Sequence, residues 1–387
     1  MNLLALAERW GEAVLQPAVS YKQERCLYTA DKFAACTACQ SICPVGAIQF
    51  GPPPAFSADS CQQCRACLPV CPVGAYAADD EVESLLKCAA QLGRESCEIV
   101  CELNPHAAFG APSAAAIRVR GCLAGLGIGA YLALVDQGLT QVIVRLEACA
   151  NCPWSSLRAQ VESQVAQARH ILAAWDQAEK LVCTGPEIID GFKKRPFWNA
   201  GSPPISRRNL FRLQPTEKEE RVSISSPFRE RLRVLQAISH RPPIADDERL
   251  WHGLGFALIT VSDECTACGV CSRACPTGAL QMVTEGSSFQ LLFTPPACID
   301  CNICHHVCNP QAITISHDLT YDQIIRAEAD QIVQHGELTH CAKCRASFTS
   351  KTGSRLCPTC EFRRQHPFGS VMPPALAANL KHEEKSA

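Results

Sequence analysis

The feature that most constrains this chain is its cysteine content: 27 of its 387 residues are cysteine, most of them in C-x2-C pairs. In a secreted protein such a number would predict disulfide bonds. The opening stretch, MNLLALAERWGEAVLQP, has acidic residues among its apolar ones and lacks the basic and apolar segments of a signal peptide. We therefore expect the thiols to bind metal ions or clusters, because the short turn of a C-x2-C pair aims two thiolates at one centre.

A short phrase that begins with a cysteine recurs along the chain. It is CPVGAI at Cys43, CPVGAY at Cys71, CPTGAL at Cys275 and CNPQAI at Cys308. The copies form two pairs, which indicates a duplicated module that is present twice. In the second pair the pattern C-x2-C-x2-C-x3-C is intact in both copies, and the segment ALQMVTEGSSFQLLFT between them predicts a β-hairpin. Such spacing favours cluster binding over structural zinc.

The two intact runs of the second pair closely resemble the bacterial ferredoxins that hold two [4Fe-4S] clusters. In that family the fourth cysteine of each run binds the other cluster, which keeps the two clusters close together for electron exchange. The resemblance implies one cluster on Cys265, Cys268, Cys271 and Cys308, and a second on Cys298, Cys301, Cys304 and Cys275. Asn309 departs from the pattern, because the other three runs have proline directly after the fourth cysteine.

The N-terminal pair has one intact run and one incomplete run. The same crossing implies a complete cluster on Cys43, Cys61, Cys64 and Cys67. The other cluster retains the ligands Cys36, Cys39 and Cys71, but Phe33 stands where its first cysteine belongs. Three alternatives remain for the missing ligand of this cluster. The cluster could be a [3Fe-4S] form, a non-protein ligand could take the place, or a cysteine from outside the run could do so. We favour Cys26, because the loop between it and Phe33 is long enough to fold back; Cys88 is the next candidate.

Residues 97–185 follow a different pattern, in which short runs rich in β-branched residues alternate with helical stretches. This alternation predicts a parallel sheet, which binds ligands beyond the carboxyl ends of its strands. Several cysteines, Cys183 among them, stand at or just after predicted strand ends. The segment is similar to the delta subunit of methyl-viologen-reducing hydrogenases. That resemblance implies a [2Fe-2S] cluster on Cys101, Cys122, Cys149 and Cys152; the alternative is that these are small buried apolar residues.

A rival interpretation of the same segment is a dinucleotide site. Gly125, Gly127 and Ala130 have the spacing G-x-G-x-x-A between a strand and a helix, and Glu147 ends the next strand, where an acid that binds ribose belongs. Against this interpretation, the turn after the strand is longer than such a site needs. In addition, Cys149 crowds the position that follows Glu147.

Two further segments complete the chain. Residues 188–250 are basic and rich in proline and serine, which predicts a linker. Within it, SPFRERLRVLQAISH has the pattern of a short basic amphipathic helix, either solvated or docked on an acidic partner. Near the C-terminus two C-x2-C pairs predict a tetrahedral site for structural zinc, with rubredoxin-like iron as the alternative. Its ligands are Cys341, Cys344, Cys357 and Cys360.

These patterns predict an α+β multi-domain fold. Two ferredoxin-like dicluster modules flank a small α/β parallel-sheet domain, and a zinc-ribbon-like knuckle follows. The expected parts are a first ferredoxin module at 1–80, the α/β domain at 81–187, the linker at 188–250, the second ferredoxin module at 251–318, a helix and the knuckle at 319–365, and a polar tail at 366–387.

The expected cofactors are four [4Fe-4S] clusters, one of them replaced by [3Fe-4S] if its fourth ligand is missing, together with a [2Fe-2S] cluster and one zinc ion. No nucleophile–base motif or phosphate-binding loop stands out in the sequence. We therefore expect an electron-transfer protein, more a non-catalytic subunit than an enzyme, that passes single electrons between oxidoreductase partners. The alternative is an iron–sulfur reductase whose middle domain binds NAD(P) or uses its thiols on a substrate.

Charge and hydropathy bear on the partners. The formal net charge of −2 implies no overall attraction to nucleic acid. No apolar run reaches the roughly 18–20 residues of a membrane span. We therefore expect a cytoplasmic protein whose partners are other redox proteins or subunits.

Overall fold

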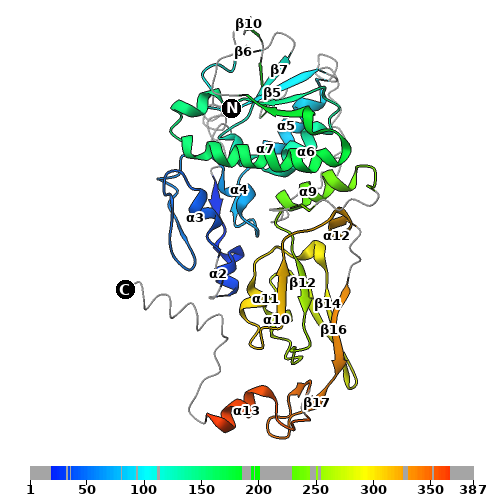
Figure 1. Cartoon of the computed structure of the whole chain (residues 1–387). Helices are drawn as coiled ribbons and strands as arrows, with labels where there is room; N and C mark the ends of the chain where they lie inside the picture. Colours follow the sequence, from blue (N-terminus) through cyan, green and yellow to red (C-terminus); the bar gives the residue numbers. More distant parts are fainter. Residues whose placement is uncertain are drawn as a thin grey trace, which may run out of the picture. The chain divides into compact units, whose positions relative to one another are not determined.

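The structure is a computed structural model, and it describes residues 19–366 with gaps (Figure 1). The gaps are 32–33, 35, 80, 93–94, 111–113, 185–192, 196, 201–228, 245–249, 252–253, 326–329 and 351–352. Phe33, part of the predicted linker and nearly all of the predicted tail therefore lie outside the described residues. By its internal contacts the chain divides into two compact units, Met1–Arg25 with Thr37–His240 and Cys26–Cys36 with Arg241–Ala387. The module boundaries expected from the sequence remain a prediction.

The first unit is built around a five-stranded parallel sheet with the order β11-β7-β5-β8-β9. Its strands are β5 (Ser96–Val100), β7 (Ala114–Arg118), β8 (Val142–Val144), β9 (Leu181–Cys183) and β11 (Phe197–Asn199). The first four coincide with the runs of β-branched residues, so the predicted parallel sheet is confirmed. The edge strand β11 was not predicted, because three residues inside a proline-rich segment are too few to show a periodic pattern.

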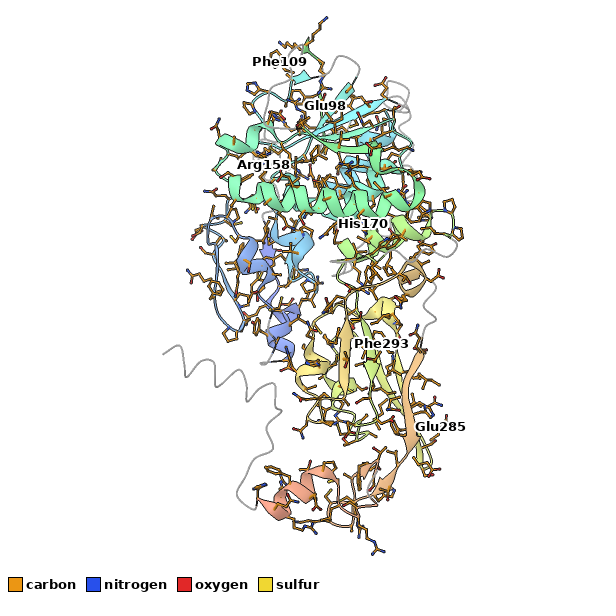
Figure 2. The ribbon with its side chains drawn as sticks, in the orientation of Figure 1. Glu98, Phe109, Arg158, His170, Glu285 and Phe293 are labelled. Carbon is orange, nitrogen blue, oxygen red and sulfur yellow. The ribbon has the colours of Figure 1, made fainter. Side chains whose placement is uncertain are left out.

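Helices pack on this sheet, and the strands are accordingly apolar along both faces. The main helices of this unit are α5 (Glu81–Ala90), α6 (Ile128–Val135), α7 (Arg158–Leu172) and α9 (Arg229–Ser239). Ile99 on β5 and Val144 on β8 are fully buried. The long α7 runs alongside α6, and α9 packs on α6 (Figure 1). Figure 2 labels Arg158 and His170, which mark the two ends of α7. The helix predicted within the linker is therefore confirmed as α9.

A network of charged groups is buried around β5 and the end of β8. Glu98, in the middle of β5, is 1% exposed and accepts a hydrogen bond from Arg145 at 2.8 Å. It also pairs with Arg195. Arg145 donates from its Nε to Glu147 at 2.7 Å. Because a buried charge costs on the order of several kcal/mol unless it is paired, these contacts fix the segment that leaves β8.

Short elements surround the cysteine-rich start of the first unit. The strand β1 (Ser20–Tyr21) pairs antiparallel with β4 (Tyr76–Ala77), and β2 (Ile48–Gln49) pairs with β3 (Ala55–Phe56). The helices α3 (Ala38–Ile42) and α4 (Cys67–Val70) lie against each other. The rings of Tyr21 and Tyr76 stack with centroids 5.0 Å apart, and Phe56 meets both edge-on. A third small pair joins β6 (Phe109–Gly110) to β10 (Lys193–Lys194).

The second unit is antiparallel. Its strands are β12 (Leu258–Val261) paired with β15 (Ile313–Ser316), and the sheet β13 (Leu280–Glu285), β14 (Ser288–Phe293) and β16 (Gln331–Glu337). The predicted hairpin is confirmed as β13–β14, with Glu285 exposed at its tip and Phe293 fully buried at its base (Figure 2). The third strand, β16, was not predicted.

Short helices and a small knuckle complete the second unit. The helices are α2 (Leu27–Ala30), α10 (Val270–Ala274), α11 (Ile303–His306), α12 (Tyr321–Ile325) and α13 (Pro358–Gln365). In the knuckle, β17 (Thr339–His340) pairs with β18 (Ser347–Phe348) ahead of α13. Among the described residues, no helix has the length and apolar character needed to cross a membrane.

Candidate cluster and metal sites

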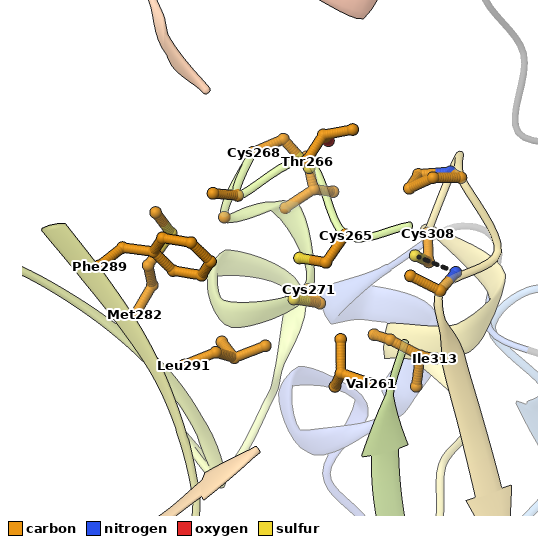
Figure 3. Close-up of a pocket in the computed structure, with 15 residues that line it drawn as sticks. Val261, Cys265, Thr266, Cys268, Cys271, Met282, Phe289, Leu291, Cys308 and Ile313 are labelled. Atoms are coloured by element: carbon orange, nitrogen blue, oxygen red, sulfur yellow. Dashed lines mark hydrogen bonds between the residues drawn. The ribbon is translucent and has the colours of Figure 1, made fainter. Parts of the chain in front are cut away.

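A pocket of about 430 Å³ in the second unit is lined by cysteines from both of its runs (Figure 3). Cys265 and Cys268 come from the loop that leads into α10, Cys271 lies in the first turn of α10, and Cys308 comes from the turn that follows α11. The remaining wall is mainly apolar and includes Val261, Phe289, Leu291 and Ile313. The four thiols therefore face one shared space between the two runs.

A second pocket of about 380 Å³ lies in the same unit. It is lined by Cys298, Cys301 and Cys304 of the second run and by Cys275 of the first. Ile259, Leu280, Phe293 and Ile315 form much of its apolar wall. The structure thus brings together both of the crossed sets that the ferredoxin resemblance implies.

The chemistry of these thiols suits a cationic cluster. Burial raises the pKa of Cys271 to about 12 and that of Cys301 to about 11. A thiolate in such surroundings needs positive charge close by, which iron supplies and water here does not. The donor set of four thiols on apolar walls therefore fits a [4Fe-4S] cluster.

The three intact runs share one backbone conformation around their second cysteine. The residues directly before and after it have positive φ in every case: Gln63 (58°) and Arg65 (68°), Ala267 (52°) and Gly269 (65°), Asp300 (53°) and Asn302 (59°). This conformation costs an L-residue about 1–2 kcal/mol, so each loop holds its backbone against a local preference. In the incomplete run, Thr37 directly after Cys36 has φ −120°. The run without a first cysteine therefore also lacks the left-handed residue after its second.

The phrase after the fourth cysteine also repeats in three dimensions. Its fourth residue has positive φ in all copies: Gly46 (64°), Gly74 (55°), Gly278 (69°) and Gln311 (52°). In two of the copies the next residue turns its N–H back to the cysteine sulfur. Ala75 donates to Cys71 Sγ at 3.2 Å, and Ala312 donates to Cys308 Sγ at 3.3 Å. Such bonds favour the thiolate and tune the potential of a cluster that it holds.

In the first unit the structure gathers the complete N-terminal set. Burial raises the pKa of the Cys67 thiol most strongly, and the nearby thiols Cys64, Cys61 and Cys43 raise it further. Cys43 follows α3, and Cys67 begins α4. The packing of these two helices brings the fourth cysteine of one run to the other run, as the crossing requires.

The four cysteines of the incomplete set are divided between the units. Cys39 and Cys71 belong to the first unit, and Cys26 and Cys36 to the second. Cys26 directly precedes α2 and is half-buried. This set, with Cys26 as its fourth ligand, remains a prediction. The other candidate, Cys88, is fully buried on α5, where its Sγ lies 3.8 Å from the carbonyl oxygen of Asn199. Cys88 therefore has the surroundings of a small apolar core residue.

The carboxyl edge of the parallel sheet carries a further pocket of about 380 Å³. It is lined by the four predicted cysteines of the middle domain, Cys101 after β5, Cys122 after β7, and Cys149 and Cys152 after β8. Burial raises the pKa of Cys122 to about 12 and that of Cys101 to about 11. Four thiols around one pocket, one of them buried and three half-buried, fit an iron–sulfur cluster better than scattered core packing. Cys183 ends β9 and is exposed.

The same region argues against a dinucleotide site. A pyrophosphate would need the N-terminus of α6, but Gly129 N–H there donates to the Glu230 carboxylate of α9 at 2.7 Å. A Cβ atom on Gly127 would stand 2.4 Å from that carboxylate group. Glu147, the acid predicted to bind ribose, also has hydrogen-bond partners within the protein. Burial acts to raise the pKa of Glu147, but hydrogen bonds from Arg145 and Asn104 lower it overall.

The C-terminal knuckle forms a compact site with four cysteines. The Sγ atoms of Cys341, Cys344, Cys357 and Cys360 all lie within 4.8 Å of one another. Cys357 N–H donates to Cys341 Sγ at 3.3 Å. Backbone N–H groups of Cys344 and Cys357 lower the pKa of Cys341 to about 6, so a thiolate forms readily there. This geometry fits a tetrahedral metal ion, as the spacing predicts.

Two stretches of the chain match known families. Residues 53–76 and residues 259–281 each match a 4Fe-4S binding domain. The first contains the run Cys61, Cys64, Cys67 and Cys71, and the second contains Cys265, Cys268, Cys271 and Cys275. The comparison with curated proteins finds no match for the chain. The chain therefore contains two 4Fe-4S binding domains, one from each of the repeated modules.

Sequence reasoning missed the residues that join the middle pocket to the N-terminal run. Trp154 lines that pocket and donates from its Nε1 to the Oε1 of Gln62 at 2.8 Å. The only sign in the sequence is an aromatic residue just after the second C-x2-C cysteine, which by itself predicts packing.

Proposed function

We propose that this chain is a multi-cluster iron–sulfur protein that passes single electrons between partner oxidoreductases. The observation that carries the proposal is the crossed arrangement of cysteines in the second unit, where each pocket takes three thiols from one run and one from the other. The two matched 4Fe-4S binding domains support it independently.

Iron–sulfur clusters supply reversible one-electron chemistry when bound. The residues of the chain hold the iron through thiolates, exclude water with apolar walls, and keep neighbouring sets together. In the second unit, the thiols of Cys271 and Cys304 lie close enough that Cys271 contributes to the raised pKa of Cys304. The crossing of Cys275 and Cys308 between the runs fixes this proximity.

We assign four [4Fe-4S] clusters to the two modules, with Cys26 completing the set of Cys36, Cys39 and Cys71. A [2Fe-2S] cluster belongs to Cys101, Cys122, Cys149 and Cys152, and zinc belongs to the knuckle. Catalysis then takes place on the partners, and the chain functions as a cytoplasmic subunit of an oxidoreductase complex. The contact of Glu230 with α6 disfavours the NAD(P)-dependent alternative.

Metal analysis of the full chain, purified without oxygen, tests this assignment. We expect about 16–18 iron atoms and one zinc ion per chain, together with reversible one-electron couples at low potential. An iron content near eight would mean that only one module holds clusters. Absence of reversible couples would reject electron transfer and favour a sensor or assembly protein with labile clusters.

A further inference from the structure

The loop that carries Cys64 lies directly against the segment that carries Cys122. Cys122 N–H donates to the carbonyl oxygen of Cys64 at 3.1 Å. One hydrogen bond therefore joins a predicted ligand of the N-terminal module to a predicted ligand of the parallel-sheet domain. Both residues belong to the first compact unit.

Glycine makes this close approach possible. A Cβ atom on Gly121 would stand 3.0 Å from the carbonyl oxygen of Gln63 and 3.1 Å from that of Cys64. A Cβ atom on Gly125 would stand 2.9 Å from Cβ of Arg65. Gly121 also has φ +76°, so two independent reasons require glycine at this position.

Buried polar contacts hold the two segments in place. Gly121 N–H donates to Glu102 at 2.8 Å. Glu81, which is 6% exposed, accepts from Nε of Arg120 at 2.6 Å and lies 3.5 Å from the buried Arg65 guanidinium. The hydrogen bond from Trp154 to Gln62 at 2.8 Å adds a link from the far side of the middle pocket. The buried pair of Glu81 and Arg65, together with these hydrogen bonds, ties the two segments to each other.

We propose that this junction makes the set of Cys101, Cys122, Cys149 and Cys152 the direct electron-exchange neighbour of the set of Cys43, Cys61, Cys64 and Cys67, with Gly121 and Trp154 as positioning residues. The inference rests on the proposed function. One electron leaves the reduced group on one set and arrives at the oxidised group on the other, and no bond forms or breaks. The electron comes from a low-potential one-electron donor, such as a reduced partner.

The test is electron paramagnetic resonance on the full chain, loaded with its clusters and reduced with dithionite. We expect the signal of the middle set to be split or broadened by its paramagnetic neighbour. Cys122→Ala should remove that signal alone. Gly121→Ala should reduce the splitting at unchanged iron content, because the added Cβ forces the two loops apart.

Gly138→Ala is the matched control. Gly138 has φ +78° and no neighbouring atom within 4 Å of an added Cβ, so it brings the same backbone strain without the contact. If Gly121→Ala does not fold, Trp154→Phe keeps an aromatic side chain but removes the indole N–H and with it the bond to Gln62, and a reduced splitting is again expected. Equal splitting in all these variants would overturn the inference.

The outcomes separate this inference from the proposed function. If the middle set binds no iron, or if its signal is unsplit in the wild type, the junction has no electronic role while the ferredoxin modules stand. If the modules themselves show no reversible couples, the proposed function fails as well.

Discussion

A single residue, Phe33, separates the incomplete run from the other three. The three complete runs hold left-handed residues on both sides of their second cysteine, and Thr37 shows that the incomplete run does not. A different loop conformation is what a different fourth ligand would require. Cys26 directly precedes a helix and is half-buried, whereas Cys88 is fully buried in the helical layer on the sheet. Cys26 remains the predicted ligand, with Cys88 as the alternative.

Replacing Cys26 tests which group is the fourth ligand of this cluster. We expect Cys26→Ala to convert one cubane to a [3Fe-4S] cluster, because three thiolates remain to hold it, and to produce the corresponding paramagnetic signal in the oxidised protein. Cys88→Ala is the control and should leave the spectrum unchanged. A spectrum that changes in Cys88→Ala but not in Cys26→Ala would identify Cys88 as the fourth ligand. No change in either variant would indicate a non-protein ligand.

At the scale of elements, α9 decides what the parallel-sheet domain can bind. The spacing of Gly125, Gly127 and Ala130 is compatible with a phosphate-binding turn, yet α9 places Glu230 over the N-terminus of α6. A carboxylate there stabilises the first turn and the positive end of the helix dipole. An internal anion thus occupies the position at which an external one would bind.

Removing that carboxylate should destabilise the first unit without creating a cofactor site. We expect Glu230→Ala to lower the free energy of unfolding by about 1–2 kcal/mol, measured by thermal or denaturant unfolding. Glu179→Ala is the control, because Glu179 is 89% exposed and its ion pair with Arg169 contributes little. Titration with NADPH should give neither binding nor cluster reduction in any of these proteins. NADPH binding by Glu230→Ala would instead support the alternative of a reductase whose middle domain binds NAD(P).

At the scale of the whole molecule, hydrogen bonds join some of the sets of cysteines to a neighbouring set. In the second unit the knuckle is linked to the ligand loop of the second module. Thr349 donates from its hydroxyl to the carbonyl oxygen of Cys265 at 2.9 Å and from its N–H to that of Thr266 at 3.2 Å. A metal ion bound by the knuckle would therefore support a segment that carries a predicted cluster ligand.

Loss of the knuckle metal should weaken the binding of iron by the cluster that includes Cys265. We expect Cys360→Ser to remove zinc and to speed the release of about four iron atoms to a chelator, because the Thr349 contacts weaken when the knuckle opens. Metal analysis over time measures both effects. Cys183→Ser is the control, since this exposed thiol lies outside the predicted sets. Iron loss at the wild-type rate in Cys360→Ser would show that the knuckle and the cluster are independent. A knuckle that holds iron and no zinc would favour the rubredoxin-like alternative.

The sequence alone determined the cysteine runs, their spacing and the alternation of strand and helix, because these are local patterns with a short period. The β-branched runs predicted β5, β7, β8 and β9, and the C-x2-C pairs predicted the knuckle site. Local sequence patterns do not predict contacts between residues that are far apart in the chain. Only the tertiary structure decided that β11 closes the edge of the sheet, that Glu230 covers α6, and that Cys122 meets Cys64, because packing of distant segments creates each of these contacts.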